Sequence, residues 1–302
     1  MRGDGRRTAA LGGPARLAIT VVLLAAGCAA IGAAVAGGLG AAIAVVLAAA
    51  LVAAVCAYGD RLALSAMAAR PVSEVENPEL YRLVGELSKA GRLPVPRLFV
   101  SPASQPNAFA VGTGPRNATV CCTAGLLSEL DEAELRGVLG HELAHTCGRD
   151  IFASTVSAGL ATVITFPAGL GRLLPGRAGT GSRASAHDGP ASLGLSESLL
   201  MLVLGPIAAL IIRLSVSGAR EYRADAAGAQ LAGDPVALAS ALRKIDAGTE
   251  ELALAPDGRM TSVGHLMIAC PFRADGFARL FLTHPPAGER VRRLEALAGY
   301  RR

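Results

Sequence analysis

The sequence is poor in aromatic residues, in lysine and in histidine. It has no tryptophan, only 4% aromatic residues, and two lysines among 29 basic residues. Proteins that bind nucleic acids combine basic patches with aromatic side chains that stack on bases. Here the arginines are spread along the chain without such aromatics, so we expect no nucleic-acid partner. The net charge of +5 is better explained by contact with anionic lipid.

Charged residues are also scarce, at 18%, whereas apolar residues make up 52% and the mean hydropathy is +0.44. Two uncharged runs, residues 17–37 and 40–58, are each long enough to cross a bilayer as a helix. A cleavable signal peptide is disfavoured because the second run follows the first directly. We therefore predict an N-terminal transmembrane hairpin within residues 1–58 and a lipid bilayer as a partner.

The basic residues near the N-terminus predict the orientation of this hairpin. Four arginines precede the first run, and the turn between the runs is uncharged: Arg2, Arg6, Arg7 and Arg16. The positive-inside rule then places both ends of the hairpin in the cytoplasm. The six cysteines show no pairing pattern, and adjacent ones such as Cys121 and Cys122 cannot easily bridge each other, which fits a reducing compartment.

Two of the five histidines lie in the sequence His141-Glu142-Leu143-Ala144-His145. Residues i and i+4 lie one turn apart on one helix face, so both imidazoles can reach one ion. Glu142 between them can face a water activated by the metal and take its proton. In a chain of this composition a chance match is expected only about 0.004 times. The motif predicts a hydrolytic metal site.

The residues around the motif predict an amphipathic helix. Asp131 is placed as its N-cap, with Glu134 three residues later as in a capping box, and Leu135, Leu139 and Leu143 form an apolar stripe. Gly148 is expected to end the helix. Charged residues on the other face indicate a water-exposed domain. An intramembrane metalloprotease would instead need an apolar spanning run here.

A hydrolytic site needs a third protein ligand and an open position. No other histidine cluster exists, so a carboxylate is expected. Glu221 is the first candidate, because it shares a helix face with Asp225, which could accept the N–H of a ligating imidazole. Spacing alone leaves alternatives open. Glu221 could pair with a neighbouring arginine, and Asp150 is another candidate carboxylate.

Several further segments then follow in a familiar order, and the chain resembles the HtpX-type membrane metallopeptidases, relatives of the CaaX prenyl endopeptidases. The matching segments are Asn-Ala-Phe-Ala-Val-Gly at 107–112, Gly-Leu-Leu at 125–127, the metal motif within 132–150, Arg-Glu-Tyr-Arg-Ala-Asp at 220–225, Thr-His-Pro-Pro at 283–286 and Arg-Val-Arg-Arg-Leu at 290–294. Cys121, Cys122 and Cys147 depart from the family pattern, and small buried thiols explain them better than redox sensing.

The resemblance implies an endopeptidase in which His141, His145 and Glu221 bind one Zn²⁺ per chain and Glu142 is catalytic. It also implies a mainly helical, gluzincin-like catalytic domain with a small β-sheet, and protein substrates cut at cytoplasmic segments during quality control of membrane proteins. The sequence itself does not select the cation, since two histidines and a glutamate also suit Co²⁺ or Mn²⁺. It does not indicate an oligomeric state.

If Glu221 completes the site, an even number of membrane crossings separates it from His145. Two apolar runs lie between them, residues 151–171 and 198–212, joined by a loop rich in glycine, serine and arginine. We predict that both runs cross, giving four transmembrane helices in an α+β multi-pass protein of the plasma (inner) membrane. The expected organisation is a hairpin at 1–58, two halves of a cytoplasmic catalytic domain at 59–150 and 218–302, and a second hairpin at 151–217.

Within the catalytic halves, helices are expected from Asn77-Pro78 and over residues 235–245, and short strands at 97–100, 108–112 and 119–122. An edge strand before the metal helix could bind extended substrate by main-chain pairing. Three residues are further candidates for substrate or oxyanion contacts: Asn107, His284 and Arg290. His265 is expected in the core, and His187 is expected to be inert.

Two other functions remain open from the sequence. The first is a non-catalytic, membrane-anchored zinc-binding scaffold, which Glu142 argues against because a structural site closes with four ligands and needs no base. The second is a CaaX-type prenyl peptidase, which four spans argue against because those enzymes enclose a chamber with more.

Overall fold

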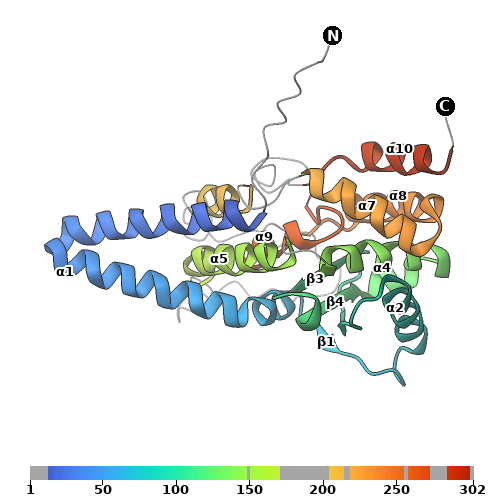
Figure 1. Ribbon diagram of the computed structural model, residues 1–302, viewed down its shortest axis with the longest axis horizontal. Coiled ribbons are helices and arrows are strands. Elements are labelled where there is room, and N and C mark those ends of the chain that lie inside the picture. The colour runs from blue at the N-terminus through green and yellow to red at the C-terminus, as the bar shows by residue number, and fades with distance from the viewer. Residues whose placement is uncertain are drawn as a thin grey trace, which may run out of the picture.

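The structure is a computed structural model that describes residues 13–147, 150–170, 204–213, 218–254, 258–272 and 284–299. A long helical hairpin projects from a set of shorter helices packed around a small sheet (Figure 1). Several sequence predictions fall outside the described residues: the helix stop at Gly148, the loop at 172–197 with His187, and Thr283.

The hairpin is formed by α1 (Gly13–Ala66), which non-helical backbone angles at Ala36 and Gly37 divide into two arms. Gly37 has a φ of 60°, which costs a residue without a Cβ little. Next to the turn, Gly32 and Gly40 approach so closely that a Cβ on either would clash with the backbone of the other. A helical hairpin is therefore present near the N-terminus, and glycine permits its tight turn; that this hairpin crosses a membrane stays a prediction.

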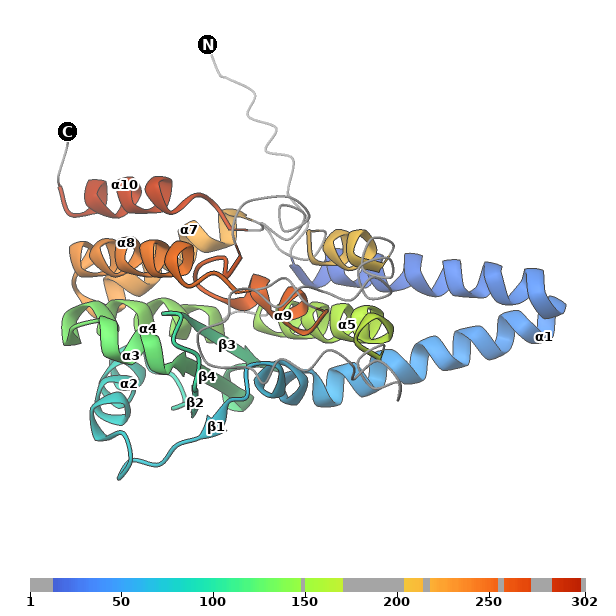
Figure 2. The same ribbon diagram turned by 180° about the vertical axis from the view of Figure 1, so that it is seen from behind.

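α1 is the one helix in the described part of the chain that is long and apolar enough to cross a membrane. Between its arms lies α5 (Asp150–Leu170), and the helix Leu204–Arg213 lies alongside, as both views show (Figures 1 and 2). Residues of all these helices share one apolar cluster: Leu17, Val55, Ala153, Val156, Leu160 and Ile211. The later apolar stretches, Ile151–Thr165 and Leu204–Arg213, are shorter, so four transmembrane helices are not confirmed.

The sheet has the strand order β1-β2-β4-β3. Its strands are β1 (Arg70–Pro71), β2 (Arg97–Ser101), β3 (Ala108–Gly112) and β4 (Ala118–Thr123). β2 runs parallel to β4, and the other two pairs are antiparallel. The three predicted strands are confirmed to within one residue. β1 was not predicted, because a two-residue exposed strand that contains proline carries no alternating pattern.

The main core lies between the sheet and the helices that pack against it. These are α2 (Pro78–Gly91), the short α3 (Ala124–Glu129), α4 (Glu132–Cys147), α8 (Pro235–Glu251) and α10 (Ala287–Leu297). Leu83, Leu139 and Leu238 are among their buried side chains, and each contributes roughly 1.5–3 kcal/mol by burial. α8 begins where Asp234 caps it but extends six residues beyond the prediction.

α7 (Gly218–Ala232) packs directly against α4. Glycines permit the contact: a Cβ on Gly228 would clash with the backbone of His141, and one on Gly140 would clash with Gly228. This close approach brings Glu221 and Asp225 to the metal motif. Two further elements, α9 (Gly258–Val263) and the 3₁₀ turn Gly264–Leu266, pack near α5 and β3, and a second 3₁₀ turn, Pro115–Asn117, leads into β4.

Candidate metal centre

The metal helix α4 begins with the predicted capping box. The Glu134 N–H donates to Asp131 Oδ1 at 2.9 Å, and the Asp131 N–H donates to Glu134 Oε2 at 3.1 Å. Such a cap stabilises a helix start by about 1 kcal/mol. Leu135, Leu139 and Leu143 are buried as predicted. The stripe fixes the rotation of the helix, and the metal motif therefore faces α7.

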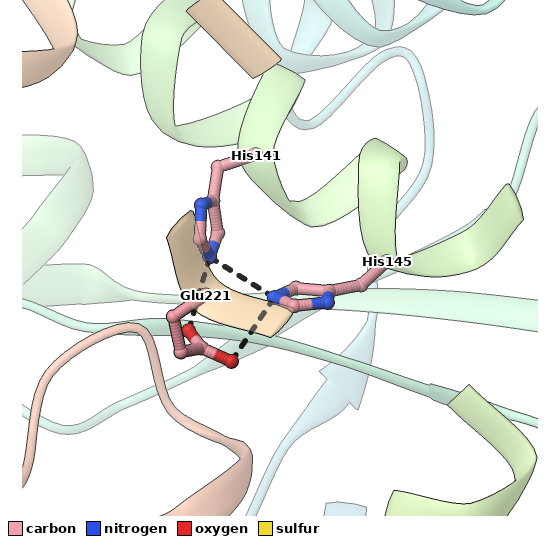
Figure 3. A group of neighbouring side chains, drawn as sticks. All are labelled: His141, His145 and Glu221. Atoms are coloured by element: carbon pink, nitrogen blue, oxygen red, sulfur yellow. Dashed lines mark hydrogen bonds and ion pairs between the residues drawn. The ribbon is translucent and has the colours of Figure 1, made fainter. Parts of the chain in front are cut away.

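His141, His145 and Glu221 converge on one point (Figure 3). The Nε2 atoms of the two histidines lie 3.1 Å apart. His141 Nε2 lies 3.7 Å from Glu221 Oε2, and His145 Nε2 lies 3.7 Å from Glu221 Oε1. Two ligand atoms 2.0–2.1 Å from one ion at a tetrahedral angle are about 3.3 Å apart. Glu221 Oε2 is buried without a hydrogen-bond partner. The donor set therefore fits a metal ion.

A second carboxylate orients the first histidine. Asp225 Oδ1 lies 2.9 Å from His141 Nδ1, which leaves Nε2 free to bind an ion. Arg290 holds Asp225 through two hydrogen bonds of 2.7 and 2.8 Å, and its Nη1 donates to the Ile268 carbonyl at 2.6 Å. Burial opposes ionisation, but the hydrogen bonds from Arg290 and His141 lower the pKa of Asp225 to about 2.

Glu142 is 1% exposed, and neither of its carboxylate oxygens has a hydrogen-bond partner. Burial, together with the nearby charge of Glu221, raises the pKa of Glu142 to about 8. Burial lowers the pKa of His145 to about 4, so this imidazole is neutral at pH 7, as a metal ligand must be. Burial also disfavours the Glu221 anion, but His145 and His284 beside it hold the pKa of Glu221 well below its usual range.

The structure brings His284 to the site together with Arg220, which the sequence analysis considered only among the arginines that could pair with Glu221 in place of a metal ion. His284 Nδ1 lies 3.4 Å from Glu221 Oε2, and its side chain is 7% exposed. Arg220 Nε lies 3.4 Å from Glu221 Oε1, and its guanidinium also donates to Ser154 Oγ of α5. The sequence signal for Arg220 was its position next to Glu221, which equally suits a solvent-exposed helix residue.

Two of the predicted contact residues have different partners in the structure. The side-chain amide of Asn107 donates to the Ala269 carbonyl at 3.0 Å, and its oxygen accepts from the Ala108 N–H at 3.1 Å. Asn107 therefore links the start of β3 to the segment at 269, and its contact with a substrate carbonyl stays a prediction. Arg290 donates to Asp225 and to the Ile268 carbonyl, so its guanidinium holds a carboxylate in place; the oxyanion contact of Arg290 stays a prediction.

β3 is an edge strand, as expected, but the chain itself uses part of its outer edge. The Ile268 N–H donates to the Ala108 carbonyl at 2.9 Å, and the Gly112 N–H donates to Thr155 Oγ1 at 3.0 Å. In β4, Cys121 and Cys122 are buried as expected, whereas Cys147 at the end of α4 is exposed, so the expectation of a buried thiol there is wrong. Burial raises the pKa of the Cys121 thiol to about 12, so this thiol is unreactive. His265 is buried, as expected.

The apolar hairpin, the three converging ligand atoms and the buried unpaired glutamate define a metallopeptidase with a membrane anchor. Comparison with known proteins agrees. The sequence model described as Peptidase family M48 matches residues 74–298, and the chain belongs to this family. A protease HtpX homolog of Kineococcus radiotolerans is 54% identical over 241 residues, 80% of each chain. Another, of Paenarthrobacter aurescens, is 46% identical over 300 residues, 98% of this chain and 97% of the relative.

These matches confirm the HtpX-type resemblance and the prediction of a metalloendopeptidase. The homolog of Bifidobacterium longum is 48% identical over 241 residues. The matches cover both halves of the catalytic part, and the one of Paenarthrobacter aurescens extends through the hairpin as well. The substrates of this peptidase are proteins or peptides.

Proposed function

We propose that this metalloendopeptidase uses one zinc ion held by His141, His145 and Glu221. The observation that carries the proposal is the convergence of three ligand atoms within 4.8 Å of one another, beside a buried carboxylate without a partner. Two neutral nitrogens and one carboxylate oxygen match the ligands of hydrolytic zinc sites. When bound, zinc supplies a Lewis acid that polarises the scissile carbonyl and makes water more acidic.

Glu142 is the proposed general base. Its carboxylate takes a proton from the attacking water and passes that proton to the leaving amine. The positive charge of a bound ion would favour the ionised form of Glu142, which burial alone disfavours. Asp225 and Arg290 keep His141 in the tautomer that binds metal. We assign His284 the donation of a hydrogen bond to the developing oxyanion, since its Nδ1 faces Glu221 whereas its Nε2 is buried without a hydrogen-bond partner.

We further propose that the substrates are membrane proteins cut at their cytoplasmic segments during quality control. The apolar hairpin, directly joined to the catalytic part, supports a site held close to a bilayer, and the four N-terminal arginines support a cytoplasmic orientation. The second pair of crossings remains part of this proposal. It is supported by the apolar cluster that α5 and Leu204–Arg213 share with both arms of α1.

The test is cleavage of casein and self-cleavage by the detergent-purified chain, with added zinc or with chelator. Glu142→Gln keeps the three ligands, so it is expected to bind zinc and to lose at least about 1,000-fold in kcat/KM. The matched control is Glu132→Gln, an exposed residue on the same helix, which keeps full activity. Cleavage that survives in Glu142→Gln contradicts the mechanism. Stoichiometric zinc without cleavage by the wild type indicates a scaffold, and a requirement for prenylated peptides indicates a prenyl peptidase.

A further inference from the structure

A cavity of about 600 Å³ adjoins the metal centre. α8 forms one wall, and the segments at 268–272 and 284–290 form the others. The cavity meets the site at His284, which lines it and also lies 3.4 Å from Glu221. We propose that this cavity is a substrate subsite that selects a lysine or arginine side chain near the scissile bond. The proposal rests on the peptidase function proposed above.

The walls of the cavity suit the aliphatic part of a long basic side chain. Leu242, Ile268, Phe272 and Pro285 contribute apolar surface. Lysine and arginine bury their methylene stems on such surfaces while the charged end remains near water. A volume of this size is typical of sites that enclose a ligand, and it can take a side chain together with neighbouring main chain of an extended peptide.

The rim of the cavity carries the charge that would select a cation. Asp246 and Glu250 lie one turn apart on α8, on the face that also presents Leu242 to the cavity. Within the described part of the chain neither carboxylate forms an ion pair. Of the lining residues that the structure describes, Arg290 is the one with a permanent positive charge, and its guanidinium is already bound to Asp225. An ammonium or guanidinium group of a bound peptide would therefore meet the carboxylates of Asp246 and Glu250, to which it can donate charge-assisted hydrogen bonds.

A second feature independently indicates that a ligand enters here. The His284 side chain is 7% exposed; its Nδ1 faces Glu221 Oε2 at 3.4 Å, but its Nε2 is buried without a hydrogen-bond partner. Buried polar groups without hydrogen-bond partners are uncommon unless a ligand or ion supplies the missing partner. Because His284 stands where the cavity meets Glu221, a peptide bound along the cavity would present its main chain to this imidazole and its side chain to the acidic rim.

The test compares peptides that differ at one position. A quenched fluorescent peptide that the chain cleaves is varied, at each of the three positions on either side of the scissile bond, among lysine, arginine, norleucine and glutamate. At one position we expect lysine and arginine to exceed norleucine by roughly 10- to 100-fold in kcat/KM, as for a charge-assisted hydrogen bond. The preference should decrease with added salt, since the rim is exposed.

Variants link the preference to the rim. In the double variant Asp246→Asn, Glu250→Gln the lysine-to-norleucine ratio is expected to fall to near 1, and in Asp246→Lys, Glu250→Lys glutamate becomes the preferred residue. Glu251→Gln is the matched control, because Glu251 is exposed next to Glu250 and does not line the cavity; the ratio stays at the wild-type value. An absence of basic preference at every position, or a preference that survives in the double variant, overturns the proposal.

Measuring peptide affinity without turnover tests the proposed subsite separately from the proposed peptidase function. In the Glu142→Gln background, anisotropy of labelled lysine and norleucine peptides measures affinity without turnover. A tenfold or greater preference for lysine that disappears with Asp246→Asn, Glu250→Gln supports the subsite even if no peptide is cleaved. Equal affinities reject the subsite even if the wild type cleaves casein.

Discussion

The hairpin and the metal centre both depart from the usual distribution of polar and apolar groups. The hairpin exposes apolar side chains, whereas the metal centre buries charged ones. In the hairpin, apolar side chains such as Val35 are up to 82% exposed, and the most apolar stretch of α1 is only 6% buried. In the metal centre, the charged or ionisable side chains of Glu142, Glu221 and Arg290 are at most 2% exposed. Apolar surface in water and charge in the interior are both unfavourable.

The comparison teaches that each region depends on a component from outside the chain. Lipid removes the cost of the exposed apolar arms. In the centre, Arg290 neutralises Asp225 and Arg220 pairs with Glu221, but Glu142 forms no ion pair within the described part of the chain, and a divalent cation would balance its charge. The predictions below disturb one region at a time.

The largest effect is expected from Glu221→Gln in the metal centre. The amide keeps the shape of the side chain but removes the anionic ligand, so metal affinity should fall on the order of 1,000-fold. Cleavage should disappear at ordinary zinc concentrations. Titration with zinc against a competing chelator measures the affinity. Unchanged affinity would show that another residue is the third ligand, and Asp150→Asn would then be the variant to examine.

In the hairpin, Leu47→Arg places a charge on an exposed apolar surface near the middle of the second arm. A charge at the centre of a membrane-spanning helix costs about 2.5–3.5 kcal/mol on insertion scales. We expect most of the chain to be lost from the alkali-resistant membrane fraction. Leu252→Arg, at a comparably exposed position just after α8, is the control and should remain membrane-bound. Equal behaviour of the two variants would contradict a transmembrane hairpin.

The metal-free chain should become more stable when the buried carboxylate is removed. The pKa of Glu142 is about 8 in the folded chain and 4.5 as the reference value, so ionisation opposes folding and stability is lost as pH rises from 4.5 to 8. At pH 7 the loss is about 3 kcal/mol. Thermal unfolding followed by circular dichroism with chelator present should therefore show a wild type less stable than Glu142→Gln, increasingly so with pH. Comparing the two chains cancels the opposite titration of His145. A pH-independent difference would contradict the raised pKa.

The smallest effect is expected from Arg290→Lys. The lysine keeps the charge but cannot form both hydrogen bonds to Asp225 and the bond to Ile268 at once. Loss of a residue that orients a metal ligand weakens metal binding by roughly 10- to 100-fold, and kcat should fall less. Arg293→Lys, exposed on the same helix α10, is the control. An effect on peptide affinity with unchanged metal affinity would instead place Arg290 in substrate binding.

The comparison of regions also explains what the sequence could predict. The hairpin, the α4 capping box and the three strands depend on residues close together in sequence, and their patterns were visible. The pair His141 and His145 was visible for the same reason. Glu221 could be assigned as the third metal ligand only through family resemblance. Its separation from the motif along the chain does not indicate whether the two are close in space, so a surface glutamate paired with an arginine was an equally good interpretation.

Contacts between distant segments could not be read from the sequence. Arg290 meets Asp225 across 65 residues, and Asn107 meets Ala269 across 162. No periodicity links such pairs. The sequence therefore suggested substrate contacts for Arg290 and Asn107, whereas in the structure each residue connects two distant segments of the chain. The acidic rim was likewise hidden, since Asp246 and Glu250 resemble any solvent-exposed pair until α8 is seen beside His284.

The division of the ligands between α4 and α7 has a consequence for how the enzyme is made. Glu221 follows His145 by 76 residues, and a ribosome adds about 5–20 residues per second. For about 4–15 s the nascent chain carries the histidine pair and its base without the third ligand. The hairpin of α1 is synthesised well before Glu221, so the nascent chain can reach the membrane before its metal site can be completed and before it can cleave a peptide bond.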